Sequence, residues 1–151
     1  MQINRTFFRN TFLAGVCLLG IGLAKTVSAH DLNQTLLASN GPSATDLFLV
    51  QCYSEGGAST DRLAVRFMRR LTSANSFLNL QVIKGTVART ASVATAINVW
   101  SPWVYVAQGN GEYLMAINQT HAVNSAYRVE YHCSKSDGTH TGTGLVLMQN
   151  Q

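Results

Sequence analysis

Histidines are the residues of this chain whose type and position most clearly suggest chemistry. If a leader is cleaved after Ala29, His30 becomes the first residue of the mature chain. Its free α-amine and its ring nitrogen can then chelate one metal ion together. A second histidine would complete a T-shaped set of three nitrogens, an arrangement that suits Cu(II). The second ligand could be His121, His132 or His140, and spacing does not choose among the three.

Three aromatic residues form the second candidate site. Trp100, Trp103 and Tyr105 flank Pro102, which predicts a strand edge or a loop at this point. Such rings can stack on sugars or anchor a protein partner, although core packing is the more frequent role of such residues. Because the two tryptophans do not follow the strand period of two, we expect at least one of these two tryptophans to be exposed near Pro102. The expected ligand is a glycan or another cell-surface component.

No motif for catalysis is recognisable. The chain has no Gly-x-Ser-x-Gly elbow, no His-Glu-x-x-His and no phosphate-binding loop. Its seven carboxylates fall mostly in predicted turns. We therefore predict no catalytic residues and a non-catalytic binding or surface-associated module. A copper-binding protein with the metal at His30 is the alternative.

The first 29 residues have the features of a secretory signal. Arg5 and Arg9 precede an apolar run at residues 12–23, and small residues at 27–29 form a cleavage site. The run is shorter than the roughly 20 apolar residues that a spanning helix needs. A lipid anchor on Cys17 is the less favoured alternative, because a valine precedes it. We expect a secreted or periplasmic domain at residues 30–151, with no membrane span.

Removing the leader changes the charge balance. The sequence has eleven Lys and Arg residues, three of which lie in the leader, against seven Asp and Glu residues that all lie beyond it. The near-neutral remainder gives no indication of a nucleic-acid partner. One basic cluster remains, and we expect it to be a solvated strand end, with an anionic surface or polysaccharide contact as the alternative. It consists of Arg62, Arg66, Arg69 and Arg70.

Two cysteines follow the leader, Cys52 and Cys133, and both end strand-like segments. In an oxidising compartment they can form one intramolecular bridge. Closing this loop of 81 residues would contribute about 4–5 kcal/mol in the chain-entropy model. Two free buried thiols are the alternative.

Apolar and polar residues alternate most clearly over residues 126–134, where Tyr127, Val129, Tyr131 and Cys133 share one face. This period of two is typical of a strand with one buried face. The segment at 30–43 could be an edge strand or an arm, and 86–98 is expected to hold one or two short strands. In total, seven or eight strands predict a single-domain antiparallel β-sandwich, either jelly-roll or immunoglobulin-like. The other predicted strands are 46–53, 62–69, 77–83, 103–106, 112–118 and 144–148.

The last two strand-like segments that precede residue 135 resemble known sandwich domains. Tyr131 stands two residues before Cys133, as in immunoglobulin-type domains, but no tryptophan closely follows Cys52. A longer stretch resembles the closing hairpin of bacterial pre-peptidase C-terminal domains, which are secreted jelly rolls. That resemblance implies an accessory module for surface or substrate attachment rather than catalysis. Its residues are Gly111, Tyr113, Met115 and Ile117, then Tyr127, Val129 and Tyr131.

The position of His30 carries a further resemblance. A mature N-terminal histidine is similar to the histidine brace of lytic polysaccharide monooxygenases and of periplasmic copper-binding sandwiches. Only His30 is matched. The resemblance implies a copper ion as cofactor.

Overall fold

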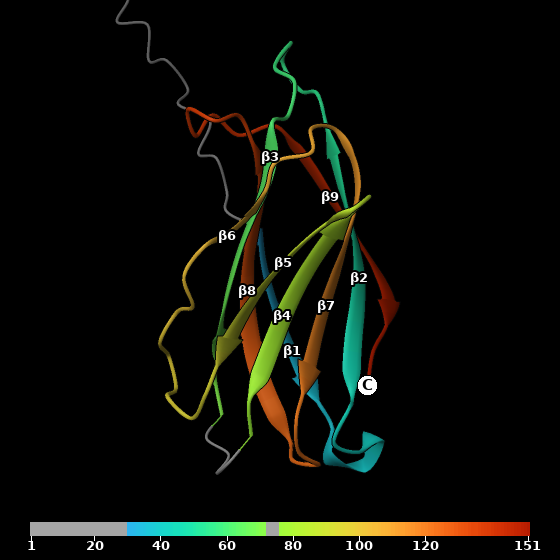
Figure 1. The fold of residues 1–151 in the computed structure, drawn as a ribbon, viewed down its shortest axis with the longest axis vertical. Coiled ribbons are helices and arrows are strands. Elements are labelled where there is room, and N and C mark those ends of the chain that lie inside the picture. The colour runs from blue at the N-terminus through green and yellow to red at the C-terminus, as the bar shows by residue number, and fades with distance from the viewer. Residues whose placement is uncertain (1–29, 72–75) are drawn as a thin grey trace, which may run out of the picture.

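The protein folds as two antiparallel sheets packed face to face (Figure 1). The structure is a computed structural model that describes residues 30–71 and 76–151. The predicted leader at residues 1–29 and most of the predicted polar connection at 72–76 lie outside the described residues. In the described ranges, no helix is both long enough and apolar enough to cross a membrane.

In the described residues, nine strands make up the two sheets. The four-stranded sheet has the order β1-β8-β3-β6, and the five-stranded sheet has the order β5-β4-β7-β2-β9. One 3-10 turn, Ala38–Asn40, connects the two sheets between β1 and β2. The strands are β1 (His30–Leu36), β2 (Thr45–Tyr53), β3 (Arg62–Arg69), β4 (Leu78–Lys84), β5 (Val87–Val93), β6 (Val104–Val106), β7 (Gly111–Gln119), β8 (Ser125–Ser134) and β9 (Gly142–Gln149).

The alternation that predicted these strands also builds the core. On β8, Tyr127, Val129 and Tyr131 are buried between the sheets, whereas Arg128 and Glu130 on the other face are half-buried. The predicted all-β sandwich is confirmed, although it has nine strands rather than seven or eight. The two segments with the weakest pattern each form one strand, β1 and β5, and both lie at sheet edges. Edge strands have fewer packing neighbours, so their sequences alternate less strictly.

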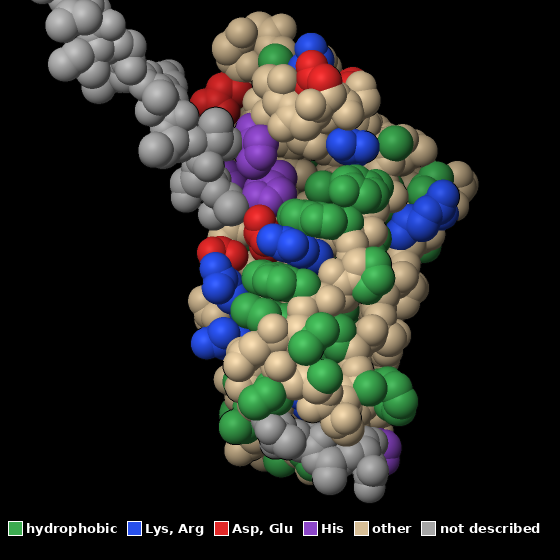
Figure 2. Space-filling view, turned by 90° about the vertical axis from the view of Figure 1, so that its left-hand side faces the viewer, with side chains coloured by type: hydrophobic (Ala, Val, Ile, Leu, Met, Phe, Trp, Pro, Cys, Tyr) green, Lys and Arg blue, Asp and Glu red, His purple; other side chains and the backbone are tan. Residues whose placement is uncertain are grey.

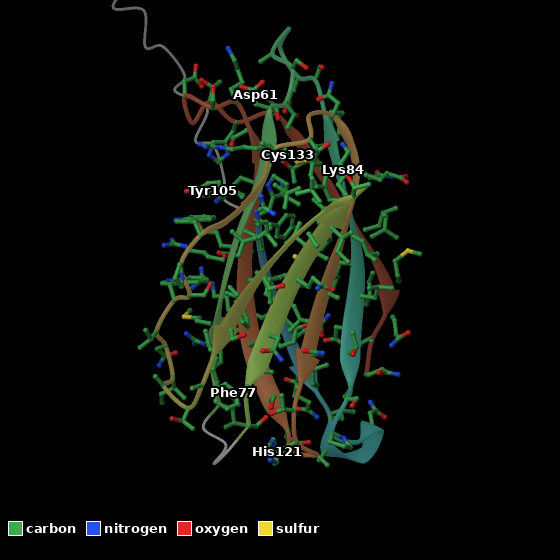
Figure 3. The ribbon with its side chains drawn as sticks, in the orientation of Figure 1. Asp61, Phe77, Lys84, Tyr105, His121 and Cys133 are labelled. Atoms are coloured by element: carbon green, nitrogen blue, oxygen red, sulfur yellow. A yellow bond between two sulfur atoms is a disulfide. The ribbon has the colours of Figure 1, made fainter. Side chains whose placement is uncertain are left out.

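A disulfide joins the two sheets. Cys52 on β2 is bonded to Cys133 on β8, 81 residues away in the sequence, which confirms the predicted bridge. Figure 3 labels Cys133 in the upper half of the sandwich. The bond therefore ties a strand of the five-stranded sheet to a strand of the other sheet.

The predicted solvated basic cluster is wrong for one member. Arg69 is fully buried, and its guanidinium donates hydrogen bonds to the backbone carbonyls of Ala94, at 2.9 Å, and Ser76, at 2.6 Å. Burial lowers its pKa from the ordinary value. Arg69 lies at the end of β3, and its two carbonyl partners lie 7 and 25 residues further along the chain. No local sequence pattern predicts these partners.

Candidate functional site

The outer face of the four-stranded sheet carries the predicted aromatic residues. Antiparallel register sets Tyr105, Ala64 and His132 in one row across β6, β3 and β8. In the next row, Arg66 lies opposite Glu130. Directly paired residues share a face of the sheet, so these side chains all project away from the core.

Arginine and aromatic side chains alternate over this face. The Arg62 guanidinium lies 4.6 Å from the ring centre of Tyr105. The Arg66 guanidinium lies 4.5 Å from the ring centres of both Trp100 and Trp103. These distances are within the range of cation–π attraction. Arg128 continues the series, with its guanidinium 5.5 Å from the ring centre of Trp100. We call these six alternating residues the ladder face: Arg62, Arg66, Arg128, Trp100, Trp103 and Tyr105.

The ladder face is open on one side of the molecule. Figure 2 shows hydrophobic and basic side chains alternating down this face, with histidine side chains beside them. Tyr105 is 44% exposed, and Trp100 and Trp103 are half-buried. The rings of Trp103 and Tyr105 are stacked, with centroids 6.3 Å apart. Of the three rings only Tyr105 is exposed, and neither tryptophan is fully exposed, against the expectation for at least one of them.

Most of the charge on the ladder face is compensated. Arg66 forms an ion pair with Glu130 at 2.5 Å, and Arg128 forms one with Asp31 at 2.5 Å. Arg62 makes no ion pair with a described residue; it donates to a backbone carbonyl at 3.3 Å, and its Nε is buried without a hydrogen-bond partner in the described part of the chain. Arg62 is thus an arginine of the ladder face whose Nε–H group has no acceptor among the described residues.

A surface pocket of about 230 Å³ lies at the upper end of the ladder face. Ala64 lies between His132 and Tyr105 in its row. Because its side chain is small, Ala64 forms the floor of the pocket, and the larger side chains on either side form its walls. The sequence contains the alternation that puts Ala64 on this face, but only the strand register reveals it as a pocket residue. The pocket is lined by Arg62, Ala64, Trp103, Tyr105, His132, Ser134, Gly138 and His140.

Two of the predicted histidines meet beside this pocket. The ring centroids of His132 and His140 are 4.7 Å apart, and the Trp103 ring lies 5.5 Å from His132. His132 is only 7% exposed, so it is less accessible than its outward position on a strand suggested. Burial lowers its pKa, and the hydrogen bond to Glu130 opposes that shift. We refer to His132 and His140 as the histidine pair.

His30 lies close to the histidine pair but on the other side of the sheet. It pairs with Tyr131 in the β1–β8 register, and its ring centroid is 5.6 Å from that of Tyr131. Since side chains alternate along β8, His132 projects from the opposite face. His121 lies beyond β7, at the end of β8 remote from His132, and Figure 3 shows it at the lower end of the sandwich.

The described side chains do not form a complete metal site. In residues 30–71 and 76–151, no group of three or more His, Cys, Asp or Glu side chains is arranged to hold a metal ion. The histidine pair supplies two nitrogen ligands, and a third would have to come from the α-amine of a processed chain or from water. The ladder face and its pocket offer aromatic stacking and hydrogen bonding.

Comparison with known proteins adds no relative. No protein-family model, no curated protein and no solved structure matches the chain.

Proposed function

We propose that this protein is a non-catalytic binding module of a secreted or periplasmic compartment, and that its ladder face binds a glycan. The observation that carries the proposal is the stacked pair of Trp103 and Tyr105 beside the pocket over Ala64. The predicted leader and the disulfide support the compartment, since disulfides persist outside the cytoplasm.

The chemistry of the ladder face suits a sugar. A pyranose has an apolar face that packs against an aromatic ring, and hydroxyls at its rim that need hydrogen-bond partners. Tyr105 offers a partly exposed ring, and Arg62 offers a buried N–H donor with no partner in the described residues. Binding sites commonly combine apolar walls with a few placed polar groups. The remaining arginines stiffen the rings by cation–π contact rather than adding net charge.

Binding to insoluble polysaccharides tests the proposal. Cellulose, chitin, xylan and peptidoglycan would be incubated with the protein and with Tyr105→Ala. Truncating an aromatic anchor costs about 2 kcal/mol or more, which is about 30-fold in Kd. The matched control is Tyr53→Ala, because Tyr53 is 52% exposed but lies on β2 of the other sheet. Equal binding by Tyr105→Ala and Tyr53→Ala, or no binding to any of the four, would contradict the proposal.

A second candidate function is copper binding at the mature N-terminus. The observation that favours it is the β1–β8 register, which pairs His30 with the neighbour of His132. Because the pairing is antiparallel, residue numbers on β8 rise towards the start of β1, so the α-amine of a chain that begins at His30 would lie towards His132. The opposite placement of the two side chains weighs against a compact brace. A Cu(II) titration followed by EPR, on protein with an authentic His30 terminus and on protein with one extra residue before it, tests this candidate. Binding that is unchanged by the extra residue would exclude it.

A further inference from the structure

The histidine pair contains an unused buried nitrogen. Three buried side-chain atoms lack a hydrogen-bond partner in the described part of the chain, and Nδ1 of His132 is one of them. An unpartnered buried polar atom costs about 1–3 kcal/mol. Such an atom is expected to serve a purpose, because a hydrophobic residue would fill the same space without that cost.

Glu130 determines which nitrogen of His132 carries the proton. The distance from Nε2 of His132 to Oε1 of Glu130 is 3.1 Å, and the other oxygen of that carboxylate accepts from Arg66 at 2.6 Å. A carboxylate paired with arginine only accepts hydrogen bonds, so Nε2 of His132 is the donor. In the neutral ring, Nδ1 then has a free lone pair. A histidine whose second nitrogen donates to a carboxylate is the usual arrangement of a metal ligand.

The spacing of the two rings also fits a shared ion. With a metal–nitrogen distance of about 2.0–2.1 Å, a metal lies roughly 3.2 Å from an imidazole centroid. Two imidazoles on one ion at ligand angles of about 90–109° therefore have centroids roughly 4.5–5.2 Å apart. The centroids of His132 and His140 are 4.7 Å apart. The observed spacing of the two rings falls in this range.

We propose that His132 and His140 form a two-imidazole site for a divalent transition-metal ion, oriented by Glu130. This site does not require His30, and its two histidines also line the pocket of the ladder face. Two neutral nitrogens favour Cu(II) over Ni(II) and Zn(II), following the general order of affinities for divalent ions. Water completes the coordination. The ladder face ends beside this ion, because Trp103 contacts His132.

Titration with Cu(II), Ni(II) or Zn(II) alone tests the site. Calorimetry gives the Kd, and tryptophan fluorescence gives the location, because Cu(II) quenches a nearby indole and the Trp103 ring is 5.5 Å from His132. We expect one ion per chain, tightest for Cu(II), with Kd raised at least tenfold by His132→Gln and by His140→Gln. His121→Gln is the matched control and leaves Kd unchanged. His140 is in a loop and half-buried, so its substitution is expected to leave the fold intact.

The outcomes separate the two-imidazole site from the N-terminal copper candidate and from glycan binding. Unchanged Kd in both His132→Gln and His140→Gln would overturn the two-imidazole site, as would an equal loss in His121→Gln. Binding that survives one extra residue before His30 but is lost in His140→Gln would support the pair and exclude the N-terminal copper candidate. Metal binding that is lost with the extra residue but kept in His140→Gln would support the N-terminal copper candidate and exclude the histidine pair. Polysaccharide binding would be measured on the same variants with a chelator present, so that loss of the glycan function is recorded separately.

Discussion

A buried tyrosine–aspartate contact between the two sheets gives the most quantitative test of the fold. The Tyr127 hydroxyl on β8 donates to Oδ2 of Asp46 on β2 at 2.5 Å. The backbone N–H of Gln151 donates to Oδ1 at 2.7 Å. Tyr127 is 1% exposed and Asp46 is fully buried. Tyr127→Phe removes the hydroxyl and leaves the ring, so the change isolates this hydrogen bond.

The magnitude follows from the charge of the acceptor. A hydrogen bond to a charged group contributes about 1.5–3 kcal/mol, against about 0.5–1.5 kcal/mol for a neutral pair. Tyr127→Phe should therefore lower the free energy of unfolding by about 1.5–3 kcal/mol at a pH above the folded pKa of Asp46. Below pH 3.8, the ordinary pKa of this side chain, the loss should shrink towards about 1 kcal/mol.

The pH dependence has a definite sign. Burial raises the pKa of Asp46 above 3.8, and the hydrogen bonds from Tyr127 and Gln151 oppose the rise. Removing the Tyr127 hydroxyl raises that pKa further. A carboxyl group with a raised pKa in the folded state stabilises the fold most below its unfolded pKa, and this stabilisation is lost as the pH rises through the folded value. The destabilisation by Tyr127→Phe should therefore grow as the pH rises through the folded pKa of Asp46, which lies above 3.8.

Urea unfolding of the protein and of Tyr127→Phe between pH 3.5 and 7 measures both quantities. Tyr53→Phe serves as control, because the side chain of Tyr53 is half exposed and its substitution should change stability by less than about 0.5 kcal/mol. A loss below about 0.5 kcal/mol at pH 7, or a loss that does not vary with pH, would refute the role assigned to the contact.

Three further substitutions test the scaffold by urea unfolding. Replacing Cys52 and Cys133 together by alanine should cost about 4–5 kcal/mol, because the bridge closes a loop of 81 residues; a cost below about 1 kcal/mol would contradict this estimate. Arg69→Met should cost about 1–3 kcal/mol for each of the two carbonyls it leaves unpaired, and no loss would show that water replaces the guanidinium. Gly142→Ala should cost about 1–3 kcal/mol, since its new methyl group would lie 2.1 Å from the ring of Tyr53. Combining it with Tyr53→Ala should restore most of the loss, and a persistent loss would point to the backbone instead.

The strands were predictable where burial imposes a strict alternation. Residues 62–69 were predicted and found as one strand, and the segment around Tyr127 to Cys133 has the strongest pattern and lies in the middle of its sheet. The segment at residues 86–98 was ambiguous because β5 pairs on one side only and none of its residues is fully buried. The alternation of apolar and polar residues reflects how strictly one face of a strand is buried. Edge strands are less buried, so their sequences alternate less clearly.

The buried charged residues could not be predicted. Asp46 and Arg69 stand near strand ends, where charged side chains are usually solvated. Their burial depends on partners far along the chain, such as Tyr127, which is 81 residues from Asp46. A single sequence gives the residue types but not the register that brings such partners together.

The candidate site was predictable in its components and not in its arrangement. The aromatic residues and the histidines were identified by type. The row that joins Tyr105, Ala64 and His132 depends on the pairing of β3 with both β6 and β8. The same pairing explains why Ala64, a residue without functional groups, shapes the pocket.

Mapping a bound glycan by NMR tests the central claim most directly. Amide chemical shifts would be followed during titration with soluble oligosaccharides of the polysaccharide that the protein retains. The proposed function predicts that the shifted amides lie in β3, β6 and β8, around Ala64 and Tyr105, and that Ala64→Leu abolishes the shifts by filling the pocket. Shifts that centre on β9 or β2, or that persist in Ala64→Leu, would contradict the assignment of the ladder face as the binding surface.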